Sequence, residues 1–300
     1  MNEAFKYRYH LALLLAALSY TSLSVSTAWL SEKGFNAFNQ IFWITLLSII
    51  FAGFFAFYVF RESWKINLKE FQYLLVNALI FLGAFTTFCL AIYFGTPIAK
   101  AVALNYAYPL MVIALSYFLL NELPSAKHWI SVILSLISVL VLIQVWTIKN
   151  LFDIQIGELM AFANSFFYGA IIVFGKKLKE DTGLSVFKSL FYAELFMLPL
   201  FILMSFILKL VEVEALSPEL QLVFPLNVWL VLFVTSITGG LLPLVLIYYG
   251  TSKVKPYVGG ILLLTEPIWV YICGLLFFEQ SLSTWGILGS IGIVFSVFLI

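Results

Sequence analysis

The sequence predicts an all-α integral membrane protein with ten transmembrane helices, arranged as two inverted-topology repeats of five helices each. Composition is the first observation: the 300-residue chain is 63% hydrophobic and 10% charged, whereas a soluble domain carries about 25% charged residues. The second is a succession of apolar runs of about 20 residues, the length that a helix needs to cross a bilayer. The third is that motifs of the first half recur in the second. The lipid bilayer is therefore an expected partner.

Charged clusters, prolines and glycines divide the chain into ten apolar runs, and we expect each to form a transmembrane helix. The first run follows Lys6 and Arg8 as a signal peptide would, but it is long enough to span and lacks a convincing cleavage context, which favours a retained first span. The approximate cores are residues 9–29, 36–60, 70–93, 96–119, 128–148, 157–175, 184–208, 226–250, 256–277 and 283–300.

The distribution of lysine and arginine predicts the orientation, because cytoplasmic loops carry an excess of both. With the N-terminus in the cytoplasm, 12 of the 16 basic residues lie in inner segments and 4 in outer ones, namely Lys33, Lys100, Lys149 and Lys209. We therefore expect a multi-pass protein of the cytoplasmic (inner) membrane with both termini in the cytoplasm. The longest outer loop, around 209–225, is acidic.

The two halves of the chain share a series of matching motifs. "LALLLAALSY" at 11–20 lies over "LMAFANSFFY" at 159–168, and "IYFGT" at 92–96 recurs as "IYYGT" at 247–251. "YPLMVIALSYFLLNE" at 108–122 lies over "EPIWVYICGLLFFEQ" at 266–280. We therefore predict repeats at 1–150 and 151–300. Because each repeat has an odd number of spans, the second is inverted, which is a transporter architecture with its substrate site near the midplane between the repeats.

These motifs also carry a family resemblance. The Glu-Pro between two apolar runs, then Glu279, Trp285 and "GILGSIG", resembles the closing module of the drug/metabolite transporter superfamily, EamA type. "GELMAFANSFFYGAIIVFGKKLKE" at 157–180 resembles the start of the second repeat in that family. The resemblance implies ten helices and export or exchange of small metabolites without ATP hydrolysis. The family often carries a basic residue near the start of span two, where this chain has Trp43, so an anion-binding role there is in doubt.

Polar residues inside the predicted spans are candidates to line a cavity, because polar side chains in hydrocarbon face the bundle interior or water. The alternative for each is interhelical hydrogen bonding or close packing; packing is favoured for Ser19, Ser22 and Ser26, which share one face of the first span. Thr235 opens "TSITGG", whose glycines either thin the helix beside a substrate or form a tolerated kink. The candidate substrate-binding residues are Tyr20, Asn77, Asn105, Tyr108, Asn164, Tyr168, Thr235 and Glu266.

Two carboxylates, Glu194 and Glu266, lie deep in predicted spans, where a charge costs about 2.5–3.5 kcal/mol of insertion free energy. Both are candidates for proton coupling, because burial favours the neutral form of a carboxyl group. Glu266 and its repeat mate Tyr108 each precede a proline, which frees the carbonyl four residues earlier. Glu266 either contacts substrate or a proton, or it holds the bundle together through a hydrogen bond. Lys100 is expected to extend to the interface; the alternative is that it attracts a substrate carboxylate.

The sequence therefore predicts a secondary transporter, an exporter or exchanger, that works by alternating access with protons as a candidate coupling ion. The predicted spans offer aromatics and amides but few fixed positive charges, so we expect a small neutral or zwitterionic metabolite, amino acids leading, rather than a phosphorylated one. A passive channel and an intramembrane enzyme are the alternatives. We expect no cofactor, no metal site and no nucleic-acid partner, since His10 and His128 lie at span ends and no HExxH, GxSxG, Walker or CxxC motif is present.

Overall fold

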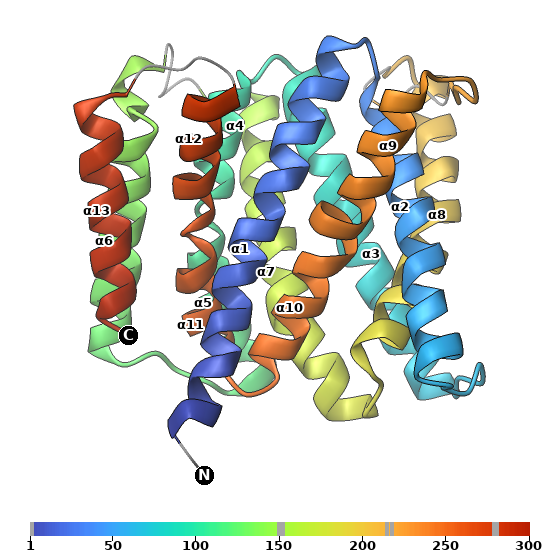
Figure 1. The fold of residues 1–300 in the computed structure, drawn as a ribbon, viewed down its shortest axis with the longest axis horizontal. Helices are drawn as coiled ribbons and strands as arrows, with labels where there is room; N and C mark the ends of the chain where they lie inside the picture. Colours follow the sequence, from blue (N-terminus) through green and yellow to red (C-terminus); the bar gives the residue numbers. More distant parts are fainter. Residues whose placement is uncertain (1–2, 149–153, 214–215, 217–218, 278–281) are drawn as a thin grey trace.

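A computed structural model describes residues 3–148, 154–213, 216, 219–277 and 282–300, and these residues form helices joined by short connections, without a strand (Figure 1). Eight helical segments are long and apolar enough to cross a membrane, and two shorter apolar helices complete the set. The prediction of an all-helical membrane protein with ten transmembrane helices is confirmed. Most ends lie within about three residues of the predicted ones, but the first helix begins at Glu3 rather than 9, the fifth ends at Leu142 rather than 148, and the sixth ends at Thr182 rather than 175.

Some spans are single helices and others are interrupted. The bounds are α1 Glu3–Glu32, α2 Ala37–Gly53 with the π-helical turn η1 Phe54–Val59, α3 Leu68–Tyr93, α4 Ile98–Asn105 with α5 Tyr108–Leu120, α6 Ala126–Leu142 followed by the short η2 Val145–Thr147, α7 Ile156–Thr182, α8 Val186–Leu210, α9 Leu226–Thr235 with the π-helical turn η4 Ser236–Leu241 and α10 Leu242–Thr251, α11 Pro256–Leu263 with α12 Glu266–Phe277, and α13 Thr284–Phe298.

Local sequence explains where several helices begin and end. Asn67 and Ser283 precede α3 and α13, and each side chain accepts a backbone N–H three residues later at 2.9 Å, which satisfies one of the free donors of a helix N-terminus. Gly183 ends α7 with a φ of 72°, a left-handed conformation that glycine adopts without a steric penalty. These capping residues fix where the helices begin and end, and so keep the connections between neighbouring spans short.

Spans four and nine are each broken in the middle, at the two prolines that the repeat alignment pairs. Residues 106–107 separate α4 from α5, and residues 264–265 separate α11 from α12. Pro109 and Pro267 follow each break directly; proline lacks an N–H and clashes with the preceding turn. Both breaks lie within the membrane-spanning part of the chain, where irregular backbone is tolerated only inside protein or beside a cavity.

Span eight contains a second kind of irregularity, the π-helical turn η4. A Cβ on Gly239 would lie 2.8 Å from the backbone nitrogen of Leu23, so only glycine lets α1 approach this closely. Ser19 Oγ donates to the carbonyl of Thr238, and Ser22 Oγ lies 2.9 Å from Thr238 Oγ1. The serine face of the first span therefore packs against η4, the role that the sequence favoured for it.

Helix contacts come in repeat-related sets. α3 packs on α7 just as α10 packs on α1, and α5 packs on α7 just as α12 packs on α1. The repeat mates α6 and α13 lie side by side at one edge of the bundle (Figure 1), where Ser131 Oγ donates to the carbonyl of Ser296. This exchange of equivalent contacts is the pattern of an inverted repeat. The predicted boundary at 150 lies outside the described residues and stays a prediction.

Two ion pairs join span four to α7, one at each end. Lys100 Nζ lies 2.9 Å from Glu158 Oε1, and the two side chains are 2% and 11% exposed. The expectation that Lys100 extends to the interface is wrong, because the first turn of α7 places a carboxylate beside it inside the bundle. At the opposite end Lys176 Nζ lies 2.7 Å from Glu122 Oε1. Lys255, the repeat mate of Lys100, is exposed.

Candidate functional site

Glu266 occupies the break in span nine and faces side chains from three other spans. It lies deep in the bundle, yet its side chain keeps part of its surface accessible. It interacts electrostatically with Tyr20 of α1, with Tyr106 and Tyr108 at the break of span four, and with Tyr168 of α7. The two repeat-related breaks and the two helices beside them thus converge on one carboxylate.

The tyrosines of this cluster also contact one another. The ring of Tyr168 lies 4.7 Å from that of Tyr108 and 5.9 Å from that of Tyr20, measured between centroids. Tyr108 donates its hydroxyl to the carbonyl of Gly260 in α11 at 3.2 Å. This bond ties the two broken spans together beside Glu266, and the aromatic rings provide an apolar wall with phenol hydroxyls.

Two acceptors at the breaks lack donors. Glu266 accepts no hydrogen bond from the part of the chain that the structure describes, and Asn105 Oδ1 is buried without a partner. Buried polar groups are nearly always hydrogen-bonded, and a vacant acceptor costs about 1–3 kcal/mol. The arrangement is therefore suited to a ligand that brings N–H donors, such as a protonated amine.

A second polar cluster surrounds Glu194 of α8. Its side chain is 6% exposed; Ser48 Oγ of α2 donates to Oε1 at 2.9 Å, whereas Oε2 is buried without a partner. Tyr248 of α10 interacts with this carboxyl group and exchanges two hydrogen bonds with the amide of Asn77 in α3, at 2.9 and 3.0 Å. Tyr20 interacts with both Glu194 and Glu266, so it lies between the clusters.

The remaining predicted site residues lie elsewhere. Asn164 Nδ2 donates to the carbonyl of Ala84 at 2.6 Å and to Thr87 Oγ1 at 3.3 Å, and so joins α7 to α3. Thr235 is buried at the end of α9, directly before η4. The structure thus gathers Tyr20, Tyr108, Tyr168 and Glu266, with Asn105 at the same break as Tyr108, and places Asn77 in the second cluster. Substrate contacts by any of them stay predictions.

Sequence reasoning missed Ser48 and Tyr248. Tyr248 belongs to the repeated "IYYGT" motif, and that repetition could have marked it. No pattern singles out Ser48, because a lone serine in an apolar run is common in membrane helices. Among the described residues, no three His, Cys, Asp or Glu side chains gather in a way that could hold a metal ion.

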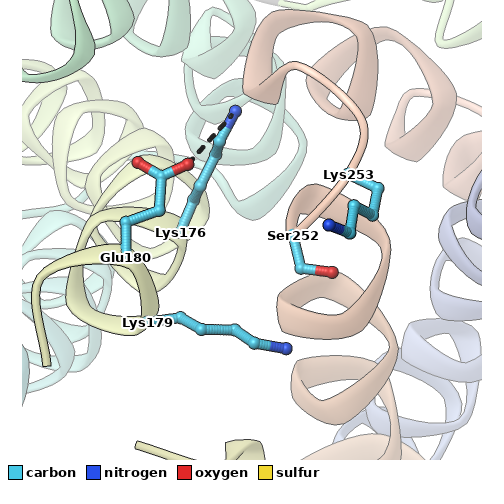
Figure 2. Close-up of a pocket in the computed structure, with 5 residues that line it drawn as sticks. All are labelled: Lys176, Lys179, Glu180, Ser252 and Lys253. Atoms are coloured by element: carbon cyan, nitrogen blue, oxygen red, sulfur yellow. Dashed lines mark ion pairs between the residues drawn. The ribbon is translucent and has the colours of Figure 1, made fainter. Parts of the chain in front are cut away.

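A cavity of about 290 Å³ lies at the end of the bundle where α7 and α10 finish, and it is lined by Lys176, Lys179, Glu180, Ser252 and Lys253. Figure 2 shows Lys179 extending from α7 toward the segment that carries Ser252 and Lys253, while Lys176 is paired with Glu180. This cavity belongs to the side that carries both chain ends (Figure 1), which is the side predicted to face the cytoplasm.

Comparisons with known proteins agree with this architecture. The sequence model of the EamA-like transporter family matches residues 8–144 and 155–300. A solved structure titled "Crystal structure of protein" is 15% identical with a TM-score of 0.74, and the match covers 97% of this chain and 96% of the other. At this identity the match shows the fold alone. No curated protein sequence matches the chain.

Proposed function

This chain belongs to the EamA-like transporter family, and we propose that it is a secondary transporter that exports or exchanges a small neutral or zwitterionic metabolite by alternating access, with amino acids as the leading class. The coarser statement, a membrane transporter of small solutes, follows from the family. The substrate class and the mechanism are proposals that rest on the cluster around Glu266.

The observation that carries the proposal is the unpartnered carboxylate of Glu266 among phenol hydroxyls. A protonated amine would supply the donors that Glu266 lacks, and a charge-assisted hydrogen bond is about twice as strong as a neutral one. The hydroxyls of Tyr20 and Tyr168 are donors suited to a substrate carboxylate. α5 and α12 both begin at the breaks, and the N-termini of half-helices favour negative charge.

The positive charges of the protein argue against a phosphorylated substrate. Lys100 is already paired with Glu158 at 2.9 Å, so its charge is neutralised near the outer end of span four. No basic side chain of the described residues is among the groups that interact with Glu266 or its four tyrosines. A phosphate in this site would lack the arginine or lysine partners that such groups require.

We further propose that the protein lies in the cytoplasmic membrane with both termini in the cytoplasm. The excess of lysine and arginine on one side supports this orientation. The Lys-lined cavity would then open toward the cytoplasm, where an exporter first meets its substrate.

Ligand-dependent thermal stabilisation across a panel of metabolites is the first test. We expect amino acids or related zwitterions to stabilise the protein, because binding to the folded state raises its apparent stability. Stabilisation by sugar phosphates or nucleotides alone would overturn the substrate class. Solutes that bind are then tested in proteoliposomes: a transporter saturates and shows counterflow, a channel does not saturate readily, and an enzyme converts the solute.

Glu266→Gln tests the site itself. The amide keeps the shape of the side chain but removes its charge, so we expect substrate affinity to fall by about tenfold or more while the protein stays folded. Glu219→Gln is the matched control, because that side chain is exposed in the outer loop. Wild-type affinity and transport in Glu266→Gln would remove Glu266 from the substrate site, and failure to fold would assign it to the architecture instead.

A further inference from the structure

The cluster around Glu194 is more closed than the cluster around Glu266, which suggests that it binds a different ligand. Glu194 is 6% exposed, whereas Glu266 keeps accessible surface. Ser48 Oγ donates to one oxygen at 2.9 Å, and the other oxygen is buried with no partner. The site is therefore too closed for a metabolite and lacks the oxygen ligands that a metal cation requires.

Among the residues that the structure describes, no charged side chain balances Glu194. α8 packs against α2, α3, η1 and α10. Ser48 comes from α2 and Tyr248 from α10, whereas the rings of η1, Phe55 and Phe57, pack against Phe187 and Phe191 of α8. The titratable side chains that face the carboxyl group are Tyr248 and, from α1, Tyr20. An ionised carboxylate held in this way, far from any cation, is costly, and uptake of a proton removes that cost.

Tyr248 interacts with this carboxyl group and also packs against α7 beside the Lys-lined cavity. Its ring rests directly on Gly175, where a Cβ would have no room. Gly175 precedes Lys176 in the chain, and Ser252 lies one helical turn beyond Tyr248; both Lys176 and Ser252 line the cavity (Figure 2). Its hydroxyl is held by Asn77. The side chain of Tyr248 therefore reaches from the Glu194 cluster to the turn of α7 that precedes Lys176.

We propose that Glu194 carries the coupling proton of the transport cycle, at a site separate from the substrate site at Glu266, and that Tyr248 controls its access to the Lys-lined cavity. The proposal rests on the proposed transport function. Tyr20 interacts with both Glu194 and Glu266, so it is a side chain through which occupation of one site can influence the other.

Proteoliposome assays with a solute that passed the binding and counterflow tests separate the two proposals. Counterflow exchanges labelled for unlabelled solute at equal pH and needs no net proton movement, whereas accumulation driven by a pH gradient does. For Glu194→Gln, a permanent mimic of the protonated form, we expect exchange to persist and driven accumulation to fall by about tenfold or more. Glu219→Gln should accumulate solute as the wild type does.

The outcomes are distinguishable. If wild-type protein exchanges no solute, the transport function fails. If it exchanges solute but accumulation ignores the pH gradient, follows a sodium gradient, or survives in Glu194→Gln, the proton site fails and the transport function stands. Should Glu194→Gln not fold, Ser48→Ala replaces it. Loss of the donated hydrogen bond should shift the pH dependence of driven transport toward higher pH, and an unchanged pH profile would overturn the proposal.

Access through Tyr248 is tested without a substrate. A water-soluble carbodiimide added from the cavity side should label Glu194 slowly in the wild type and several-fold faster in Gly175→Ala or Tyr248→Ala, as measured by mass spectrometry. Glu180 in the cavity is the internal control and should be labelled equally in all proteins. Equal labelling of Glu194 in the wild type and both variants would show that Tyr248 does not control its access.

Discussion

The ion pair between Lys100 and Glu158 gives the sharpest prediction about stability. The pair is 2.9 Å long, with side chains that are 2% and 11% exposed. Removing one partner of a buried pair costs about 3–5 kcal/mol because the other charge stays buried. The two partners differ, however: Glu158 Oε2 also accepts the Gln155 N–H at 3.0 Å and lies in the first turn of α7, where the helix dipole favours a negative charge.

The two single variants should therefore lose different amounts of stability. Lys100→Met leaves a carboxylate that keeps its cap and some exposure, and should cost about 1–2 kcal/mol. Glu158→Leu removes both the ion pair with Lys100 and the cap at Gln155, and should cost about 3–5 kcal/mol. The double variant removes both charges and should lie within about 2 kcal/mol of the wild type, the remainder coming from the lost cap.

Reversible unfolding in mixed detergent micelles measures the three free energies of unfolding. We expect a coupling energy of at least about 2 kcal/mol between the two positions. Lys209→Met, an exposed lysine at the end of α8, is the control and should change stability by less than about 0.5 kcal/mol. A coupling energy near zero, or a larger loss in Lys100→Met than in Glu158→Leu, would refute the reasoning.

Three further predictions concern topology and packing. Reporter fusions at residue 180 should lie in the cytoplasm and fusions near 215 outside; the reverse pattern overturns the orientation. Gly239→Ala brings a methyl group within 2.8 Å of the Leu23 backbone and should cost about 1–3 kcal/mol of stability. Gly260→Ala is the control, because the nearest atom is 3.6 Å away, and equal stability of the two variants would contradict this. Asn164→Leu should lower stability by about 1–3 kcal/mol without changing substrate affinity, and the opposite result would return Asn164 to the substrate site.

The sequence predicts the spans because hydrocarbon thickness imposes length and composition on each helix. It also predicts the breaks at Pro109 and Pro267, because a missing N–H acts locally and the repeat alignment pairs the two prolines. The π-helical turn at Ser236–Leu241 could not be placed in the same way. Its geometry depends on how closely α1 approaches Gly239, which is a contact between residues more than 200 positions apart.

Part of the candidate cluster can be picked out from the sequence. Glu266, Tyr108 and Tyr168 stand out by their cost in hydrocarbon and Tyr20 as the repeat mate of Tyr168, and the structure brings the four together. Lys100 was placed wrongly because its depth in the sequence says nothing about Glu158, which comes from another repeat. Ser48 was missed because its role depends on Glu194, 146 positions away. Composition and periodicity therefore do not predict which residues of one repeat contact which residues of the other.

The two ion pairs of span four have a mechanical consequence. Lys100–Glu158 and Glu122–Lys176 fasten this span to α7 at both ends, so we expect the two to rock as one rigid lever. The repeat mates of Lys100 and Glu158 are Lys255 and His10. Both are basic, so the same lysine–carboxylate ion pair cannot form between span nine and α1. In an inverted repeat with identical halves, the inward-open and outward-open conformations would have the same free energy. The ion pair between Lys100 and Glu158 has no identical counterpart in the other repeat, so we expect the two halves to differ in stiffness.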